Sequence, residues 1–446
     1  MRILFILPYI PYPLNSGGNQ AVFNMIDRAR GVYDISVLFN IRDEAGKQAL
    51  DALKKVWEDV TFYAYEETKE ETYPVNQAGD SYPDTWTCRF FDAVRKSMER
   101  KINRRMKKRY AKYGPAAFMK RSSVDFVKEH SCLYQKESML TPGFLRFVYD
   151  VARKGFDVIQ TEFYEFVSLV YLLPDDVVKL FVQHEIRYVR NQNELALFQN
   201  REPADEWLFQ LKKSEEIAAL SHYDKIVVLT DVDRKLIQAD CPNVDVYVSP
   251  AAVLPERHSY RFQYARDVVF VGHGSHFPNA DALVWFCRDV LPLVRREEPE
   301  ITVSVVGMWG NEIQSVVRSL DSRVCFVGFV DNLSEFLNGR ISVVPVRIGS
   351  GMRMKLLDAF YSVSPVVTTT KGLEGIPLVS GEDCLVADTA EGFSDAIIKL
   401  VRHEELQETL ANHALEKLSG LFDIEKLQAR RMALYDQICQ SLGKTS

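Results

Sequence analysis

The residues best suited to chemistry in this chain lie between positions 343 and 368. An apolar run is followed by a turn with Gly349 and Gly351, and the helix predicted after the turn carries Lys355 and Asp358. A glycine turn that enters a helix directs unpaired backbone N–H groups and the positive end of the helix dipole at one point, which suits a phosphate. Asp358, about two turns along the helix, can accept hydrogen bonds from a ribose or sugar hydroxyl. The segment therefore predicts a site for a nucleoside diphosphate joined to a sugar.

Three cations flank this turn, namely Arg347, Arg353 and Lys355. Breaking a sugar–diphosphate bond builds negative charge on the leaving phosphate, which cations stabilise. Cations at a helix N-terminus oppose the dipole unless an anion lies between them. We expect Gly349, Ser350 and Gly351 to bind the diphosphate together with Arg353 and Lys355. Because side chains and helix ends neutralise the charge, no metal is required.

The order and spacing of this block resemble glycosyltransferase family 4. Here the pattern reads G-S-G-x-R-x-K-x-x-D-A from Gly349, followed by S-P-V-V-x-T and then by Gly-Leu-Glu-Gly around Glu374. The resemblance covers most of the C-terminal half. It implies the GT-B fold, a UDP- or GDP-linked sugar donor, transfer with retention of anomeric configuration, and a place for Glu374 in the donor site.

This chain departs from the family pattern at three places. Ser350 occupies the position of the first Glu in the common E-x7-E motif, and Asp358 replaces the second. The loop after the first strand of the C-terminal half reads Gly272-His273-Gly274-Ser275, where many members have an Arg and a Lys. The branch with G-x-G-x-R-x-K commonly lacks the first Glu, so Arg353 and Lys355 would compensate for its loss.

The N-terminal half offers two further groups of candidate residues. Gly17 and Gly18 follow a proline-rich turn and open a predicted helix, where their backbone N–H groups would face the second domain. The alternative is a tight turn that needs positive φ. His184 ends a predicted strand ahead of Glu185 and Arg187, and the resemblance implies that His184 contacts the transferred sugar. The alternative is that His184 has only a structural role.

Other ionisable residues carry weaker predictions. Glu162 and Glu165 follow a strand end, where a carboxylate can orient an acceptor hydroxyl, although simple solvation is an equal alternative. His273 and His276 are expected to be loop residues without a catalytic role, because their spacing demands no metal. We predict no metal site and no cofactor beyond the nucleotide-sugar co-substrate.

Length and composition are those of a soluble two-domain protein. The chain has 446 residues, of which 47% are hydrophobic and 26% charged. Its seven cysteines are scattered and form no C-x-x-C pair, which favours a reducing compartment over a disulfide framework. The apolar N-terminal run is too short to span a bilayer. We expect a cytoplasmic protein, with peripheral contact at the inner face of the membrane as an option.

Short apolar runs alternate with helical patterns along the chain, which predicts parallel sheets covered by helices. We therefore predict an α/β protein of the GT-B class, with two Rossmann-like doubly wound domains facing across a cleft. The predicted boundaries are 1–250 for an acceptor domain, 251–420 for a donor domain and 421–446 for a helix that crosses back. The predicted strands are Ile3–Leu7, Ile35–Phe39, Val158–Thr161, Val177–Val182, Lys225–Leu229, Val268–Val271, Thr302–Val306, Val324–Val327, Ser342–Pro345 and Pro365–Thr368. Asn279 is the predicted N-cap of a helix over Ala280–Arg295.

The region from 66 to about 150 interrupts the alternation. From Arg89 to Arg121 there are 13 Lys and Arg residues against two acids, with apolar residues at helical spacing. Such a helix would lie on an anionic membrane surface or contact a partner, or else pack its apolar stripe on the N-terminal domain. Nucleic-acid binding is disfavoured because the rest of the chain is acidic.

These observations predict a glycosyltransferase that moves a hexose-type sugar from a nucleoside diphosphate to a hydroxyl of a saccharide or lipid-linked glycan. His184, Arg353 and Lys355 are the predicted catalytic residues. One alternative is a non-catalytic binding or scaffold subunit, because Ser350 and the 272–275 loop depart from the pattern. A nucleotide-sugar epimerase is the weaker alternative.

Overall fold

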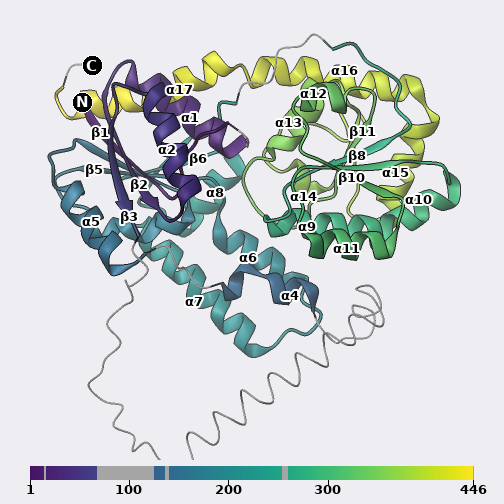
Figure 1. Cartoon of the computed structure of the whole chain (residues 1–446), viewed down its shortest axis with the longest axis horizontal. Coiled ribbons are helices and arrows are strands. Elements are labelled where there is room, and N and C mark those ends of the chain that lie inside the picture. Colours follow the sequence, from purple (N-terminus) through teal and green to yellow (C-terminus); the bar gives the residue numbers. More distant parts are fainter. Residues whose placement is uncertain (15–16, 68–124, 136–139, 254–259, 445–446) are drawn as a thin grey trace, which may run out of the picture.

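The structure is a computed structural model that describes residues 1–14, 17–67, 125–135, 140–253 and 260–444. The predicted basic helix over Arg89–Arg121 lies outside the described residues. Two lobes lie side by side, each built on a parallel sheet with helices on its faces (Figure 1).

The first sheet has seven strands in the order β3-β2-β1-β4-β5-β6-β7, and every pairing is parallel. Its central strands are continuous apolar runs because helices cover both faces, and Ile3, Phe5 and Leu180 are fully buried. The strand order reverses between β1 and β4, which is where doubly wound sheets bind ligands. Its strands are β1 Arg2–Leu7, β2 Asp34–Ile41, β3 Thr61–Glu66, β4 Val158–Glu162, β5 Val178–Gln183, β6 Lys225–Val228 and β7 Asp245–Val248.

The second sheet has six parallel strands in the order β10-β9-β8-β11-β12-β13, with its reversal between β8 and β11. All ten predicted strands are confirmed, and the fold class is α/β with two Rossmann-like domains as predicted. The strands of this sheet are β8 Val268–Val271, β9 Val303–Val306, β10 Val324–Gly328, β11 Ile341–Val344, β12 Val366–Thr368 and β13 Leu385–Val386.

Helices connect the strands in both lobes (Figure 1). In the first lobe they are α1 Gly17–Arg30, α2 Glu44–Val56, α4 Phe126–His130, α5 Pro142–Ala152, α6 Arg187–Ala196, α7 Pro203–Leu220 and α8 Asp231–Asp240, with the short helices η1 Cys132–Tyr134 and η2 Tyr164–Leu172. In the second they are α9 Phe277–Trp285, η3 Phe286–Val290, α10 Leu291–Glu297, α11 Asn311–Leu320, α12 Leu333–Leu337, α13 Met354–Tyr361, α14 Thr370–Leu373, α15 Ala390–Arg402 and α16 Glu404–Leu421.

The predicted N-cap at Asn279 is wrong. Helix α9 begins at Phe277, with His276 in the capping position, because Pro278 fits the first turn of a helix and extends it toward the N-terminus. Asn279 lies inside that first turn. Its amide nitrogen donates to the His273 carbonyl at 3.1 Å, so the residue ties the helix to the preceding loop.

The last helix, α17 (Ile424–Ser441), lies against the first lobe although α15 and α16 belong to the second (Figure 1). Four apolar residues of its inner face are buried, namely Leu427, Leu434, Tyr435 and Ile438. Its Arg431 donates to the Ser249 hydroxyl at 3.0 Å. The chain therefore returns to the first lobe by a helix that is anchored in the core.

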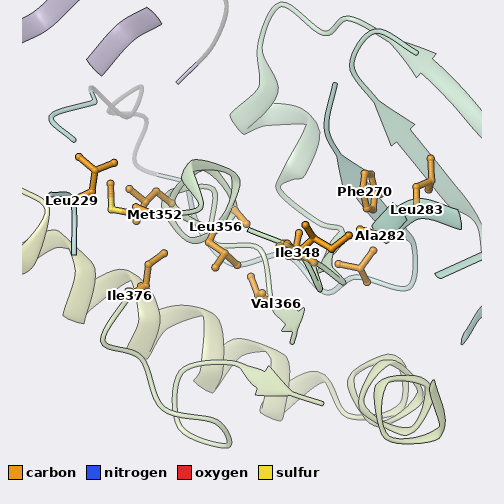
Figure 2. Close-up of a cluster of buried hydrophobic side chains, with 14 of the residues drawn as sticks. Leu229, Phe270, Ala282, Leu283, Ile348, Met352, Leu356, Val366 and Ile376 are labelled. Carbon is orange, nitrogen blue, oxygen red and sulfur yellow. The ribbon is translucent and has the colours of Figure 1, made fainter. Parts of the chain in front are cut away.

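One apolar core continues from lobe to lobe. Leu229 after β6 belongs to the same cluster as Met352 and Ile376 of the second lobe (Figure 2). The backbones also approach closely at this seam, because a Cβ on Gly375 would lie 2.3 Å from Thr230. The lobes are thus held in one arrangement by packing as well as by the crossing helix.

Within the described ranges, no helix is long and apolar enough to cross a bilayer. The same residues contain no cluster of three or more His, Cys, Asp or Glu side chains that could hold a metal ion. Six of the seven cysteines are described, and all six are free thiols.

Candidate active site

The glycine turn between β11 and α13 lies at the seam between the lobes. Gly349 and Gly351 have φ values of 118° and 76°, a region that L side chains rarely adopt. A Cβ on Gly351 would lie 2.3 Å from the backbone oxygen of His184 in the first lobe. The glycines are therefore required both for the shape of the turn and for the close approach of the lobes.

Ser350 links this turn directly to the first lobe. It is 3% exposed, and its hydroxyl accepts a hydrogen bond from the Ile186 N–H at 2.6 Å. The Gly349 N–H donates to Asn193 at 3.1 Å. One side of the turn is thus in contact with the segment that starts α6, and its other side opens into a cavity.

A cavity of 510 Å³ lies between the lobes and is lined by residues from both. Ser350, Arg353 and Lys355 line it from the second lobe, whereas Gly17, Gly18 and His184 line it from the first. The structure therefore brings together six of the residues that sequence reasoning selected, from three separate parts of the chain.

Arg353 and Lys355 are half-buried at the start of α13, and neither forms an ion pair with a carboxylate among the described residues. Arg353 donates to backbone carbonyls of the turn, and its Nη2 has no hydrogen-bond partner among the described residues. Lys355 donates to the Asn279 side chain at 2.5 Å. Burial, with help from Arg353, lowers the pKa of Lys355 to about 7. No side chain caps the first turn of α13. Unpaired cations beside uncapped N–H groups make this wall of the cavity suited to an anion.

His184 reaches the cavity from the carboxyl end of β5. Its Nε2 lies 2.7 Å from Glu162, and its ring stacks on Phe163 with 3.9 Å between the centroids. Glu162 is 2% exposed, so it supports the histidine rather than facing solvent. The imidazole is thus fixed in orientation with one nitrogen left for a ligand.

The first lobe also contributes two arginines, both of which are paired. Arg187 contacts Glu165 at 3.0 Å, and Arg190 contacts Glu185 at 3.2 Å and Glu194 at 2.9 Å. Burial alone would raise the pKa of Glu185, but Arg190 and Arg187 lower it to about 2. These charges are therefore compensated within the protein.

Gly17 and Gly18 open α1 at the edge of the cavity, as predicted from their position. Neither has positive φ, so the tight-turn alternative does not describe them. A Cβ on Gly17 would lie 2.8 Å from the Met354 side chain of the opposite lobe, whereas one on Gly18 would have only Tyr9 at 3.5 Å. Gly17 is thus needed for lobe contact.

Besides Gly349 and Gly351 of the turn, three residues that were expected at the donor site do not line the cavity. Asp358 lies farther along α13, where burial raises its pKa to about 7. Glu374 pairs with Lys371 at 2.6 Å, and its Oε1 has no partner in the described part of the chain. Arg347, expected to stabilise a leaving phosphate, forms a bidentate pair with the buried Asp281 at 2.6 and 3.1 Å.

Sequence reasoning missed Tyr9 of the cavity wall and expected Asn279 only as a helix cap. His276, expected to be a loop residue without a catalytic role, also lines the cavity. Burial lowers the pKa of His276 to about 4. Tyr9 follows β1 in the proline-rich turn, so its place at a strand end was the signal that could have identified it.

Comparison with known proteins agrees with this arrangement. Residues 265–403 match the family model described as glycosyl transferases group 1. A curated relative from Klebsiella pneumoniae, an uncharacterised 44.6 kDa protein in the cps region, is 24% identical over 221 residues. That alignment covers 46% of this chain and 56% of the relative, so the chain spans about half the length of the curated protein it matches.

Solved structures match over the whole chain. TarM has a TM-score of 0.64 at 11% identity, covering 98% of both chains. Sucrose-phosphate synthase from Thermosynechococcus elongatus has a TM-score of 0.64 at 15% identity, covering 99% of both. HepE from Anabaena, solved with UDP and glucose, has a TM-score of 0.55 at 13% identity, covering 99% of both.

These likenesses extend across both sheets and the last helix, α17. The protein has the GT-B fold, and residues 265–403 of its second lobe are similar to the glycosyl transferases group 1 model.

Proposed function

We propose that this protein is a glycosyltransferase that moves a sugar from a nucleoside diphosphate to a hydroxyl of a saccharide or lipid-linked glycan. The observation that carries the proposal is the cavity between the lobes, where the unpaired Arg353 and Lys355 lie across from His184. Residues 265–403, which match the glycosyl transferases group 1 model, include this cationic turn. HepE with UDP and glucose, and a TarM mutant from S. aureus with UDP and a GlcNAc-glycerol, are GT-B proteins crystallised with such ligands.

In this proposal the diphosphate binds at the start of α13. The free N–H groups of the helix and the side chains of Arg353 and Lys355 stabilise the charge that grows on the leaving phosphate. Asp358 binds the ribose, Glu374 supports the donor, and Gly17 and Gly18 allow the first lobe to approach the phosphates. His184 contacts the sugar.

We also propose that transfer retains the anomeric configuration. The acceptor hydroxyl attacks from the face that the diphosphate leaves, and its proton passes to the departing phosphate oxygen. The carbon–oxygen bond to the phosphate breaks as the bond to the acceptor forms, so no separate protein base is needed. Because cationic side chains neutralise the charge, we propose a reaction that is independent of a metal cofactor. Treatment with EDTA should then leave the rate unchanged.

Incubation of the protein with a panel of UDP- and GDP-sugars, with and without short saccharide acceptors, tests this function. Release of a nucleoside diphosphate together with a glycosylated acceptor is the expected result. Interconversion of one nucleotide sugar into another would indicate an epimerase. The absence of both turnover and a donor-induced rise in Tm would indicate a non-catalytic scaffold and would contradict the proposal.

A further inference from the structure

Four side chains form a continuous series of hydrogen bonds from the C-terminal helix to His184. The Tyr435 hydroxyl of α17 contacts Gln160 Oε1 at 2.7 Å, and Gln160 Nε2 contacts Glu162 Oε1 at 2.6 Å. Glu162 Oε2 then contacts His184 Nε2 at 2.7 Å. Tyr435 and Gln160 are completely buried and Glu162 is 2% exposed, so water does not compete for these bonds.

The direction of each bond follows from the chemistry of the groups. A carbonyl oxygen only accepts, so the Tyr435 hydroxyl donates to Gln160, and the Gln160 amide nitrogen must then donate to Glu162. Burial raises the pKa of Tyr435, so its hydroxyl keeps its proton. Glu162 accepts on one oxygen from Gln160, and its ionised form accepts on the other from a His184 Nε2–H. The series therefore selects one tautomer of His184.

A small cavity of 20 Å³ beside the series is lined by Glu162, His184 and Arg431. Phe163 covers one face of the imidazole. In the described part of the chain Nδ1 of His184 has no hydrogen-bond partner, and the residue lines the large cavity.

We propose that Gln160, Glu162 and Tyr435 are positioning residues that hold His184 with its proton on Nε2, which leaves Nδ1 to accept a hydrogen bond from a hydroxyl of the bound sugar. The assignment of the ligand rests on the proposed function. An unprotonated ring nitrogen binds an O–H donor but repels a phosphate oxygen, so His184 is a sugar-side contact rather than a phosphate-side one. The C-terminal helix thereby takes part in the site without lining it.

Glu162→Gln makes the sharpest test because the substitution keeps the shape of the side chain. Gln160 would still donate to the oxygen of the new amide, so the amide nitrogen would face His184 Nε2 and donate to it. The proton of the imidazole should then move to Nδ1. The 15N shifts of the ring nitrogens, assigned with a His184→Asn variant, report this change in purified protein without any substrate.

The expected results are an Nε2–H tautomer in the native protein, an Nδ1–H tautomer in Glu162→Gln and a mixture in Tyr435→Phe. Tyr33→Phe is the matched control, because the Tyr33 hydroxyl also bonds to α17, through Asp436. The Tyr33 ring packs edge-on against Tyr435, and the substitution keeps that ring while removing a hydroxyl outside the series. The spectrum of this variant should be that of the native protein. An Nδ1–H tautomer in the native protein, or an unchanged spectrum in Glu162→Gln, would overturn the proposal.

Kinetics separates this inference from the proposed function. With an active donor, kcat should fall roughly 10- to 100-fold in Glu162→Gln, by analogy with other residues that orient a catalytic group, while KM for the donor stays within about twofold. A tautomer change with unaltered kcat would overturn the role assigned to Nδ1. Absence of turnover in the native protein would instead contradict the proposed function, and the tautomer assignment would still be decided by the spectra.

Discussion

The two walls of the cavity between the lobes differ in how their cationic side chains are paired. On the first-lobe wall, Arg187, Arg190 and His184 each contact a carboxylate within 3.2 Å. On the second-lobe wall, Arg353 and Lys355 are half-buried and hydrogen-bond only to neutral groups, and the nearby carboxylates act on them only at longer range. Burying an unpaired cation costs several kcal/mol. That cost is recovered when an anion binds, so the second-lobe wall is suited to bind a charged ligand. The paired side chains of the first-lobe wall are suited to orient that ligand.

The largest effect is expected for Arg353→Ala. Removing a buried cation that stabilises a leaving phosphate should lower kcat roughly 100- to 1000-fold, as removal of a preorganised donor does in other enzymes. Steady-state kinetics with the active donor provides the measurement.

Arg347→Ala is the matched control for this prediction, because Arg347 lies on the other side of the same turn but pairs with Asp281. Loss of Arg347 leaves a buried carboxylate unpaired, which should lower the free energy of unfolding by about 1–3 kcal/mol while the donor KM stays unchanged. Equal kinetic losses in the two variants would remove the distinction between the two arginines.

Gly351→Ala tests the contact between the walls. The positive φ costs roughly 1–2 kcal/mol, and the new Cβ would lie 2.3 Å from the His184 carbonyl, so the lobes must separate. We expect kcat/KM to fall about 100-fold, which corresponds to about 2.7 kcal/mol. Small-angle scattering should show an expanded protein. An active, equally compact variant would show that lobe contact is not needed.

The pH dependence of donor binding should reveal the unpaired lysine. In the free protein the pKa of Lys355 is lowered to about 7 by burial, and that of Asp358 is raised to about 7 by burial. A rise in pH above 7 therefore removes a cation and adds an anion, and both changes oppose a diphosphate. Affinity should be constant below pH 6 and fall by up to about tenfold per pH unit above pH 7.

Lys355→Met should weaken donor binding at pH 6 and make the dependence of affinity on pH shallower. An unaltered pH dependence would show that a group other than Lys355 titrates.

The smallest effect is expected at the start of α1. Gly17→Ala would place a Cβ 2.8 Å from Met354, a flexible side chain that can move, so a loss of about two- to fivefold in kcat/KM is expected. Gly18→Ala has room and should match the native rate. The reverse order would show that open space at Gly18, rather than lobe contact at Gly17, is the important feature of this turn.

The sequence was sufficient to predict the two sheets because apolar runs and glycine turns are local patterns. Beyond the ten predicted strands, the described part of the chain has β3 and β7 at the edges of the first sheet. It also has β13, which was missed because two residues carry no periodicity. The 349–351 turn could be recognised from its spacing, whereas the place of Asn279 in the cavity wall depends on how α9 is oriented toward the first lobe. The pairing of Arg347 with Asp281 joins residues 66 positions apart, which no local pattern predicts. Whether Asp358 and Glu374 contact a donor stays a prediction.

The most direct test of the account is calorimetric titration of UDP and GDP into native protein and Lys355→Ala at pH 6.5, where most of the lysine is charged. The account predicts that one of the nucleotides binds the native protein and that the variant binds it at least tenfold more weakly, which corresponds to about 1.4 kcal/mol. Equal affinity of the two proteins would contradict the assignment of the second-lobe wall to a diphosphate.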